Sequence, residues 1–536
     1  MPDTDVIIIG GGHNGLVCAC YLADAGLDVT VLERRSVVGG AAVTEEFYPG
    51  FRNSVASYTV SLLQQKIIDD LDLYSHGLEI VERAAPNFWP LGHEDGNYLL
   101  TSYDLKETQD TFARLSQADA DRLPAYYEAL EKAAELLRTF ILEAPPNVNG
   151  GPGDIWRTLK VGNRLRRLGF DEQQLLADLF TKSAAEFLEQ WFEHPVIIGA
   201  FAFDGVVGNY ASPHAPGTAY VLLHHVFGNI GGRSGFWGHA IGGMGAITQA
   251  MAKAASQRGA TIRTEASVNR IKSDDGGANG VCLHTGEELS ARCVASNLNP
   301  KLMATMLDEA PPETKISAFK QRMKRYACHS ATFRMNVALS ELPDFLCRPG
   351  KAPDIHHKAG IIIGPDVKYL DRAYLDARTH GWSRAPVVEM LIPSTIDPTL
   401  APSGSHVASL FCQHFSYDLP DGKSWEDEKQ RAADVIIDTV TGYAPNFRSA
   451  IVGMQVLSPL DLEQNFGLVG GDIFHGRLSL DQMFSARPAL GAADYRMPLK
   501  GLYLCGSGAH PGGGVTGAPG HNAAQAILRD IRNRRI

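Results

Sequence analysis

The stretch DVIIIGGGHNGLVCACYLADAGLDVTVLERR, residues 5–35, decides the fold. It opens with the apolar, β-branched run 6–9, which is typical of a strand buried on both faces. Residues 13–26 carry apolar side chains at helical spacing and end at Gly26, a residue type that commonly follows a helix. A second strand is predicted for 28–32. These elements predict a β-α-β unit with a right-handed crossover, and therefore a parallel sheet.

The glycines between the first strand and the helix predict a dinucleotide-binding turn. Gly10 permits the tight turn, Gly12 lets the backbone approach a pyrophosphate, and Gly15 lets helix and strand pack closely. The helix N-terminus supplies free N–H groups and a partial positive charge for the anion. Glu33 ends the next strand, where its carboxylate can accept both ribose hydroxyls and would repel the 2′-phosphate of NADP. The turn alone fits NAD and FAD equally well.

The bulk composition indicates a folded protein of several domains. With 536 residues the chain is too long for one ordinary core, and 44% hydrophobic with 20% charged residues is usual for a globular protein. A formal net charge of -11 argues against a nucleic-acid partner. Few residues precede the first strand, and no apolar run reaches the roughly 20 residues of a spanning helix. We therefore expect neither a targeting segment nor a membrane span, and a cytoplasmic location.

The eight cysteines carry no chemistry in this interpretation. None of them forms a C-x-x-C pair, so neither a zinc knuckle nor a redox-active disulfide is expected, and no metal site is predicted. Scattered thiols with apolar neighbours are typical of a reducing compartment. The sequence also lacks a second glycine-rich β-α-β fingerprint, which argues against a disulfide reductase that uses NAD(P)H.

The whole chain predicts an α/β protein with a discontinuous Rossmann-like domain built on a parallel sheet, a β-sheet substrate domain and a mainly helical insertion. Helical spacing dominates residues 103–143 and 155–192, with a Pro- and Gly-rich break between them. The α/β character returns with a helix at 246–258, strands at 261–264, 268–273, 280–285 and 501–505, and a helix at 521–532. The expected domains are the dinucleotide-binding domain in three parts (1–95, 231–300 and 486–536), the helical region (96–230) and the substrate-binding domain (301–485).

The residues after the second strand narrow the ligand by resemblance. The run Glu33-Arg34-Arg35-Ser36-Val37-Val38-Gly39-Gly40 resembles the extension found in flavoproteins of the amine oxidase and phytoene desaturase superfamily. In that superfamily the position of Arg35 and the Gly-Gly turn hold the flavin diphosphate and ribityl chain. The resemblance therefore implies FAD as the cofactor and a flavin-dependent oxidoreductase as the function.

Distant segments resemble the same superfamily. Residues 502–520, LYLCGSGAHPGGGVTGAPG, are similar to the flavin-closing motif of phytoene desaturase-like enzymes, whose glycines lie against the isoalloxazine ring. Residues 237–245 and Val268 resemble the middle FAD segment, in which the backbone at Val268 meets the adenine. Phe474-His475-Gly476 and Arg487-Pro488 add a resemblance to the branch close to phytoene desaturases and retinol saturase. The cofactor-binding residues that these motifs imply are Gly10, Gly12, His13, Asn14, Gly15, Glu33, Arg34, Arg35, Gly39, Gly40, Ala41, Val268, Gly506, Gly508, Gly514, Val515 and Gly517.

The motifs assign no catalytic residue. His510 and His521 flank the glycine-rich loop, and His239 precedes the middle glycine cluster, so these three are candidates for taking a proton near the flavin. The alternatives are that His510 is a turn residue and that His521 caps the last helix. The pair His224-His225 lies in an apolar stretch without ligand partners nearby, which argues against a metal site.

A basic, partly amphipathic helix is predicted after residue 155. It contains Trp156, Arg157, Lys160, Arg164, Arg166 and Arg167. Such a helix is either a solvated face or a surface that lies on an anionic membrane and admits a lipophilic substrate. The expected partner is thus a lipophilic small molecule, with peripheral membrane contact as an open alternative.

Three functions are compatible with these observations. The first is an FAD-dependent oxidoreductase that desaturates, saturates or isomerises a C–C bond of an apolar, carotenoid- or retinoid-like substrate, with the helical region as a hydrophobic tunnel. The second is an amine oxidase-like oxidation of a C–N bond by oxygen, which would release hydrogen peroxide. The third is a flavin-stabilised regulatory or binding protein with little turnover, whose flavin no substrate would reduce.

Overall fold

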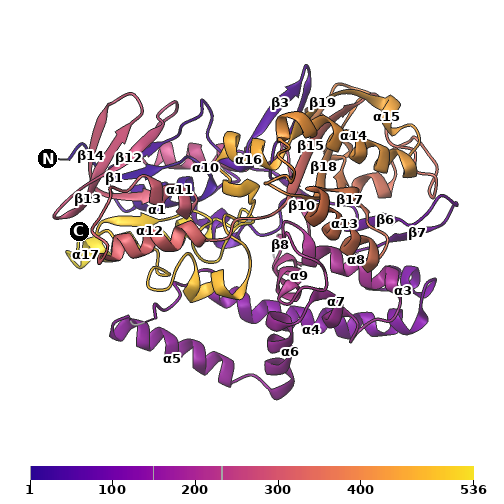
Figure 1. The fold of residues 1–536 in the computed structure, drawn as a ribbon, viewed down its shortest axis with the longest axis horizontal. Helices are drawn as coiled ribbons and strands as arrows, with labels where there is room; N and C mark the ends of the chain where they lie inside the picture. The colour runs from indigo at the N-terminus through magenta and orange to yellow at the C-terminus, as the bar shows by residue number, and fades with distance from the viewer. Residues whose placement is uncertain (1, 149, 231–232) are drawn as a thin grey trace.

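Two seven-stranded sheets form the frame of the molecule within residues 2–148, 150–230 and 233–536, which the computed structural model describes (Figure 1). The strands of the first sheet are β1 (Thr4–Ile9), β2 (Val29–Leu32), β11 (Thr261–Arg263), β12 (Val268–Asp274), β13 (Gly277–Leu283), β14 (Glu288–Ser296) and β20 (Leu502–Leu504). β11, β2, β1, β14 and β20 run parallel, whereas β13 pairs antiparallel with β14 and β12 pairs antiparallel with β13. The predicted parallel sheet from distant segments is confirmed.

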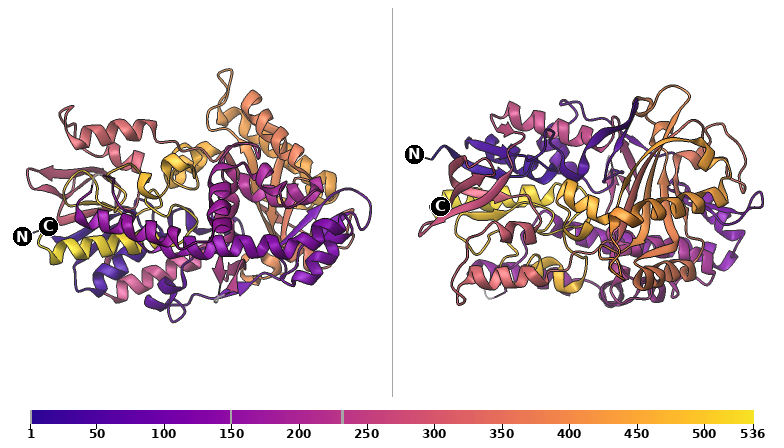
Figure 2. Two further views of the ribbon diagram at one scale, coloured as in Figure 1. Left: turned by 90° about the horizontal axis from the view of Figure 1, so that it is seen from below. Right: turned by 45° about the horizontal axis from the view of Figure 1, so that its top comes forward.

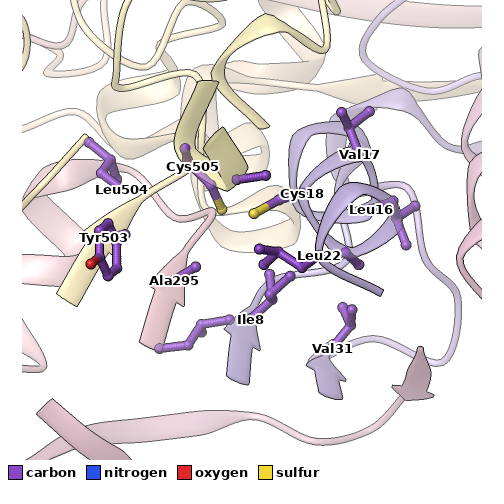
Figure 3. Close-up of a cluster of buried hydrophobic side chains, with 14 of the residues drawn as sticks. Ile8, Leu16, Val17, Cys18, Leu22, Val31, Ala295, Tyr503, Leu504 and Cys505 are labelled. Carbon is purple, nitrogen blue, oxygen red and sulfur yellow. The ribbon is translucent and has the colours of Figure 1, made fainter. Parts of the chain in front are cut away.

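The apolar run at the start of the chain fills the centre of this sheet. In register, Ile8 lies between Val31 of β2 and Ala295 of β14, and the whole run 6–9 is buried. Helix α1 (His13–Asp24) packs against α10 (Met244–Gln257) and α17 (Ala518–Arg532). Figure 3 shows the side chains that α1 directs at these strands, including Cys18, whose sulfur faces that of Cys505. All eight cysteines are free.

The second sheet is mostly antiparallel and carries the predicted substrate domain. Its strands, in spatial order, are β19 (Ile451–Leu457), β15 (Thr332–Leu339), β18 (His406–Phe415), β17 (Trp382–Leu391), β16 (Gly360–Ile363), β6 (Asn87–Pro90) and β7 (Tyr98–Leu100). Helix α14 (Trp425–Tyr443) packs against β17 and β19, and α13 (Val367–His380) against β17 and β18. The expected boundary at residue 95 groups β6 with the dinucleotide-binding segments, but β6 pairs with β16 and so belongs to this sheet.

The helical region covers the second sheet. Its helices are α3 (Leu105–Ala113), α4 (Gln117–Ile141), α5 (Pro152–Arg166), α6 (Phe170–Thr181), α7 (Ala184–Leu188), α8 (Pro195–Val206) and α9 (Thr218–Val226). Side chains of α4, α8 and α9 share a buried cluster with Ile362, Val387 and Phe411 of the sheet. Figure 2 shows the long α4 running along this side of the molecule. The helical stretch expected over 155–192 is divided into α5, α6 and α7.

Shorter elements complete the fold. They are α2 (Gln65–Asp70), α11 (Pro300–Thr305), α12 (Lys315–Arg325), α15 (Phe447–Ala450), α16 (Pro459–Phe466), β3 (Thr44–Tyr48), β4 (Phe51–Ser54), β5 (Ile80–Glu82), β8 (Asn229–Ile230), β9 (Arg233–Ser234) and β10 (Gly238–Ala240). Met303 of α11 and Phe319 of α12 share the core cluster of the first sheet, although the expected boundary at residue 300 places them in the substrate domain. In the described part of the chain, no helix is both long and apolar enough to span a membrane.

Candidate functional site

Two adjoining cavities meet next to the glycine turn. The glycine-turn cleft, of about 1110 Å³, is lined by the turn after β1, by Glu33–Arg35 and Gly39–Ala41, and by residues 266–268, 297–299 and 465–468. The aromatic cavity, of about 1130 Å³, is lined by residues 56–59 and 61–62 and by parts of α8, α9, β17, β18 and the 473–475 and 514–515 loops. The residues that line both are His13, Ala41, Leu468, His475 and Ser507.

The glycine turn has the geometry that the sequence predicts. Gly10 has a φ of +99°, which favours glycine, and Gly12 precedes α1 without any side-chain cap on the first N–H groups. A Cβ on Gly15 would lie 2.2 Å from the carbonyl oxygen of Gly10, so only glycine lets α1 sit this close to the turn. The open N-terminus of α1 therefore presents uncapped N–H groups at the cleft, where an anion is stabilised.

Glu33 and Arg35 form the polar end of the glycine-turn cleft. The Glu33 carboxylate is buried and accepts the backbone N–H of Gly11 (2.8 Å) and of Arg35 (2.9 Å). Arg35 pairs with Glu45 at 2.5 Å and lies over the ring of Phe466. The two N–H groups occupy two of the roughly four lone-pair sites of the Glu33 carboxylate, so the others can accept hydrogen bonds from ribose hydroxyls. The turn and its acidic residue are thus arranged for a dinucleotide.

Most of the predicted cofactor-binding residues line one of the cavities. Those on the glycine-turn cleft are Gly10, Gly12, His13, Glu33, Arg34, Arg35, Gly39, Gly40, Ala41 and Val268, and those on the aromatic cavity include Gly514 and Val515. Asn14, Gly15, Gly506, Gly508 and Gly517 line neither. Asn14 Nδ2 instead donates to Ser507 Oγ (3.0 Å), and Gly506 permits the backbone of Asn297 to approach. Asn14 and Gly506 thereby contact two residues that do line the glycine-turn cleft, Ser507 and Asn297.

Sequence reasoning missed a buried arginine that builds the junction of the two cavities. Arg487 is fully buried and donates to five backbone carbonyls, at Phe474 (2.7 Å), Ser507 (2.8 Å), Gly476, Gln482 and Ala509. It thereby ties the 474–476 turn to the C-terminal glycine loop. Within that turn His475 has a φ of +56°, a strained value for a residue other than glycine. In the sequence the Arg-Pro pair stands out only as part of a resemblance.

The three catalytic candidates lie elsewhere. His510 Nε2 contacts the carbonyl of Phe140 (3.0 Å), His521 Nδ1 contacts Asn522 Oδ1 (2.8 Å), and His239 Nε2 contacts Asp397 Oδ2 (3.0 Å). None of the three lines either cavity. The expectation that they act near the flavin is not supported by this placement. His521 is also not a cap, because α17 begins at Ala518, three residues earlier.

Other histidines face the cavities instead. His13 and His475 line both, while His224 and His225 of α9 line the aromatic cavity together with Trp237. Burial lowers the pKa of His13 and of His224 to about 3, so both rings are neutral at neutral pH. In the sequence the α9 pair draws notice only as possible metal ligands. Among the described residues, no group of His, Cys, Asp and Glu side chains could hold a metal ion.

Orphaned polar atoms show that the glycine-turn cleft suits a polar ligand. His13 Nε2, Arg35 Nη1 and His475 Nδ1 are buried and have no hydrogen-bond partner among the described residues. Leaving a buried polar group unpaired costs about 1–3 kcal/mol, so a polar ligand that paired with these atoms would be stabilised in the cleft. Together with the uncapped α1 N-terminus and the Glu33 carboxylate, they match the phosphates, ribose and ring edges of a dinucleotide.

The comparisons with known proteins define the class. The family model for flavin containing amine oxidoreductases matches residues 15–332, and the chain belongs to this family. It is therefore an FAD-dependent oxidoreductase, and the expected cofactor is confirmed. A solved structure of a putrescine oxidase triple mutant covers 99% of both chains with a TM-score of 0.60 at 18% identity, which confirms the fold class.

Relatives that match over nearly their full length show which members of the family the chain is similar to. It is 41% identical to pyridine nucleotide-disulfide oxidoreductase domain-containing protein 2 of Rattus norvegicus, over 99% of this chain and 94% of that protein. It is 24% identical to a limonene dehydrogenase component of Castellaniella defragrans, over 98% of this chain and 95% of that one. It is 22% identical to carotenoid 3,4-desaturase of Haloarcula japonica, over 98% of each. The resemblance to the phytoene desaturase side of the superfamily is confirmed.

Proposed function

We propose that this enzyme desaturates, saturates or isomerises a C–C bond of an apolar substrate held in the aromatic cavity. The observation that carries the proposal is the junction of the two cavities, because a substrate in the aromatic cavity would border the cofactor cleft directly at His13, His475 and Ser507. Phe203, Trp237, Phe411 and Phe474 supply large apolar walls of the kind that bind hydrocarbon. The names of two relatives refer to limonene and to a carotenoid.

FAD supplies hydride transfer when bound, and the chain has to bind the substrate, exclude water and place a proton acceptor. The uncapped N-terminus of α1 and Arg35 would hold the diphosphate, and Glu33 would hold the ribose. In the aromatic cavity, His224 Nε2 is buried, has no partner among the described residues and lies close to Gly514 of the glycine loop. A neutral ring with a free nitrogen can accept the proton that leaves the substrate carbon; with a pKa of about 3 it acts as a weak base that releases the proton again readily. We assign that role to His224.

We further propose that α5 brings the enzyme to an anionic membrane, from which a lipophilic substrate enters. No residue of α5 is buried, and Ile155 and Leu159 are 60% and 66% exposed. Phe170, just beyond the helix, is 81% exposed, and the exposed Arg166 lies on the same segment. Exposed apolar side chains beside cationic ones are typical of helices that lie in a lipid interface.

The direct test is anaerobic titration of the flavin-loaded enzyme with a panel of carotenoids, other polyenes and amines. The proposal expects a polyene to bleach the oxidised-flavin absorbance in a desaturation, or to restore that absorbance in the chemically reduced enzyme in a saturation. His224→Gln should slow that change while FAD content is unchanged. Bleaching by amines alone, followed by hydrogen peroxide in air, would identify the C–N oxidase instead. A broad panel that changes the flavin absorbance in neither direction and yields no isomerised product would favour a flavin-stabilised binding protein.

A further inference from the structure

The aromatic cavity contains charged side chains that a pure hydrocarbon would not need. Arg83 follows β5, Asp204 lies on α8, and Glu389 lies on β17, and all three line the cavity. Arg83 and Glu389 are only 6% and 8% exposed. Burying charged groups is costly unless they are paired, so their arrangement has to be explained by their partners or by a ligand.

The Arg83 guanidinium forms no ion pair with any carboxylate of the described residues. It donates to Thr59 Oγ1 and lies 5.6 Å from the ring centroid of Trp237. A planar guanidinium has five N–H donors in a fixed fork that matches a carboxylate. Arg83 is therefore a buried cation with donors left over at the wall of the cavity.

Neither acidic side chain accepts a hydrogen bond from Arg83, although Glu389 lies near enough to attract the guanidinium electrostatically. Tyr58 Oη donates to Glu389, and a second buried arginine, Arg334, lies 4.8 Å from the centroid of the same Tyr58 ring. The Asp204 carboxyl has no hydrogen-bond or ion-pair partner among the described residues. Burial, followed by the nearby Glu389, raises the pKa of Asp204 to about 8, and burial also raises the pKa of Glu389. At neutral pH the Asp204 carboxyl is thus a hydrogen-bond donor rather than an anion.

We propose that the aromatic cavity selects substrates that carry a carboxylate on an apolar body, and that Arg83 pairs with that carboxylate. The pairing would give the buried guanidinium a hydrogen-bonded carboxylate, while the aromatic side chains contact the apolar body. This inference rests on the proposed use of the aromatic cavity as the substrate site. It narrows the substrate class from any hydrocarbon to an apolar acid, and it disfavours a cationic amine beside Arg83 and Arg334.

The test compares three ligands with one alkyl body: dodecanoate, dodecanol and dodecylamine. Their dissociation constants are measured on the flavin-loaded enzyme by isothermal titration calorimetry and by the change in flavin absorbance. The structure predicts that dodecanoate binds tightest. Arg83→Gln should weaken dodecanoate by at least about tenfold and leave dodecanol unchanged, because a hydrogen bond to a charged group is lost. Arg83→Lys should recover part of the loss.

A matched control is Arg384→Gln, which removes an exposed arginine of β17 that pairs with Asp376 of α13. It should leave all three constants unchanged. Tighter binding of dodecylamine than of dodecanoate by the unaltered enzyme would overturn the inference without any variant. So would an unchanged dodecanoate constant in an FAD-loaded Arg83→Gln enzyme. If Arg83 governs dodecanoate binding but no apolar acid is converted, the proposed reaction fails and the carboxylate subsite stands.

Discussion

Replacing Gly15 by alanine should separate α1 from the turn that holds the cofactor. The new Cβ would lie 2.2 Å from the carbonyl oxygen of Gly10, far inside the 3.0 Å that Cβ atoms keep in folded proteins. It would also lie 3.1 Å from Asn297 Nδ2, so two neighbours resist it. Because the main clash is with backbone on the buried side of a helix, no side-chain rotation can relieve it.

The cost follows from two opposing effects. Overpacking of a tight site costs roughly 1–3 kcal/mol, and a backbone clash belongs at the upper end, about 3 kcal/mol. Alanine in a helix recovers about 1 kcal/mol relative to glycine. The net loss is then about 2 kcal/mol of unfolding free energy, or roughly a thirtyfold change in the folded-to-unfolded ratio. FAD affinity should fall as well, because the N–H groups of α1 shift away from the diphosphate position.

The assay is thermal unfolding of the apoprotein, together with titration of the apoprotein with FAD. Gly162→Ala is the matched control, since Gly162 is also helical and an added Cβ there would meet no atom within 4 Å. The control should keep FAD affinity and gain up to about 1 kcal/mol of stability. Wild-type FAD affinity and an unchanged melting temperature in Gly15→Ala would refute the assignment of Gly15 to close packing at the cofactor turn.

Three further predictions concern other parts of the molecule. In Arg487→Lys the ammonium group offers three N–H donors to the five carbonyls that Arg487 binds. The free energy of unfolding should therefore fall by about 2 kcal/mol or more, and the variant should release FAD more readily on gel filtration. The pKa of Asp204 is about 8 in the folded protein and 3.8 ordinarily, so the folded state loses stability as the pH rises from 4 to 8. The melting temperature of Asp204→Asn, measured relative to wild type, should therefore rise over that pH range. A difference in melting temperature that does not change with pH would contradict this. Leu159→Ser should weaken sedimentation with phosphatidylcholine–phosphatidylglycerol vesicles, whereas Leu375→Ser, which alters an exposed leucine on α13, should not; equal effects would argue against a membrane role for α5.

Local spacing was enough to find the cofactor turn. Gly10, Gly12 and Glu33 lie within one β-α-β unit, and their roles follow from backbone geometry that neighbouring residues determine. The parallel sheet could be predicted for the same reason, because a buried strand followed by an amphipathic helix has few alternative arrangements. The glycine loop at 506–517 was found by resemblance, but which of its glycines face a cavity depends on packing against Asn297 and Pro300.

No local sequence motif marks the residues that line the aromatic cavity. His224, His475 and Arg83 come from separate elements that only tertiary packing brings to one cavity. The sequence therefore favoured histidines beside glycine motifs, and these proved to be tied to backbone or neighbouring polar groups away from the cavities. The domain boundaries differ for a similar reason. β6 is close in sequence to strands of the first sheet, yet it joins the second sheet by pairing with β16, more than 250 residues later.

The proposed function requires that a C–C bond of the substrate reacts beside the FAD cleft. Its most direct test is mass spectrometry of the substrate after one anaerobic turnover with an apolar polyene acid, recorded with the flavin absorbance. Desaturation or saturation gives a product that differs by two hydrogens on an unchanged carbon skeleton, formed in step with the change in flavin redox state. Isomerisation gives a product of equal mass that chromatography separates from the substrate. Turnover confined to amines, with loss of the nitrogen and release of hydrogen peroxide in air, would contradict it.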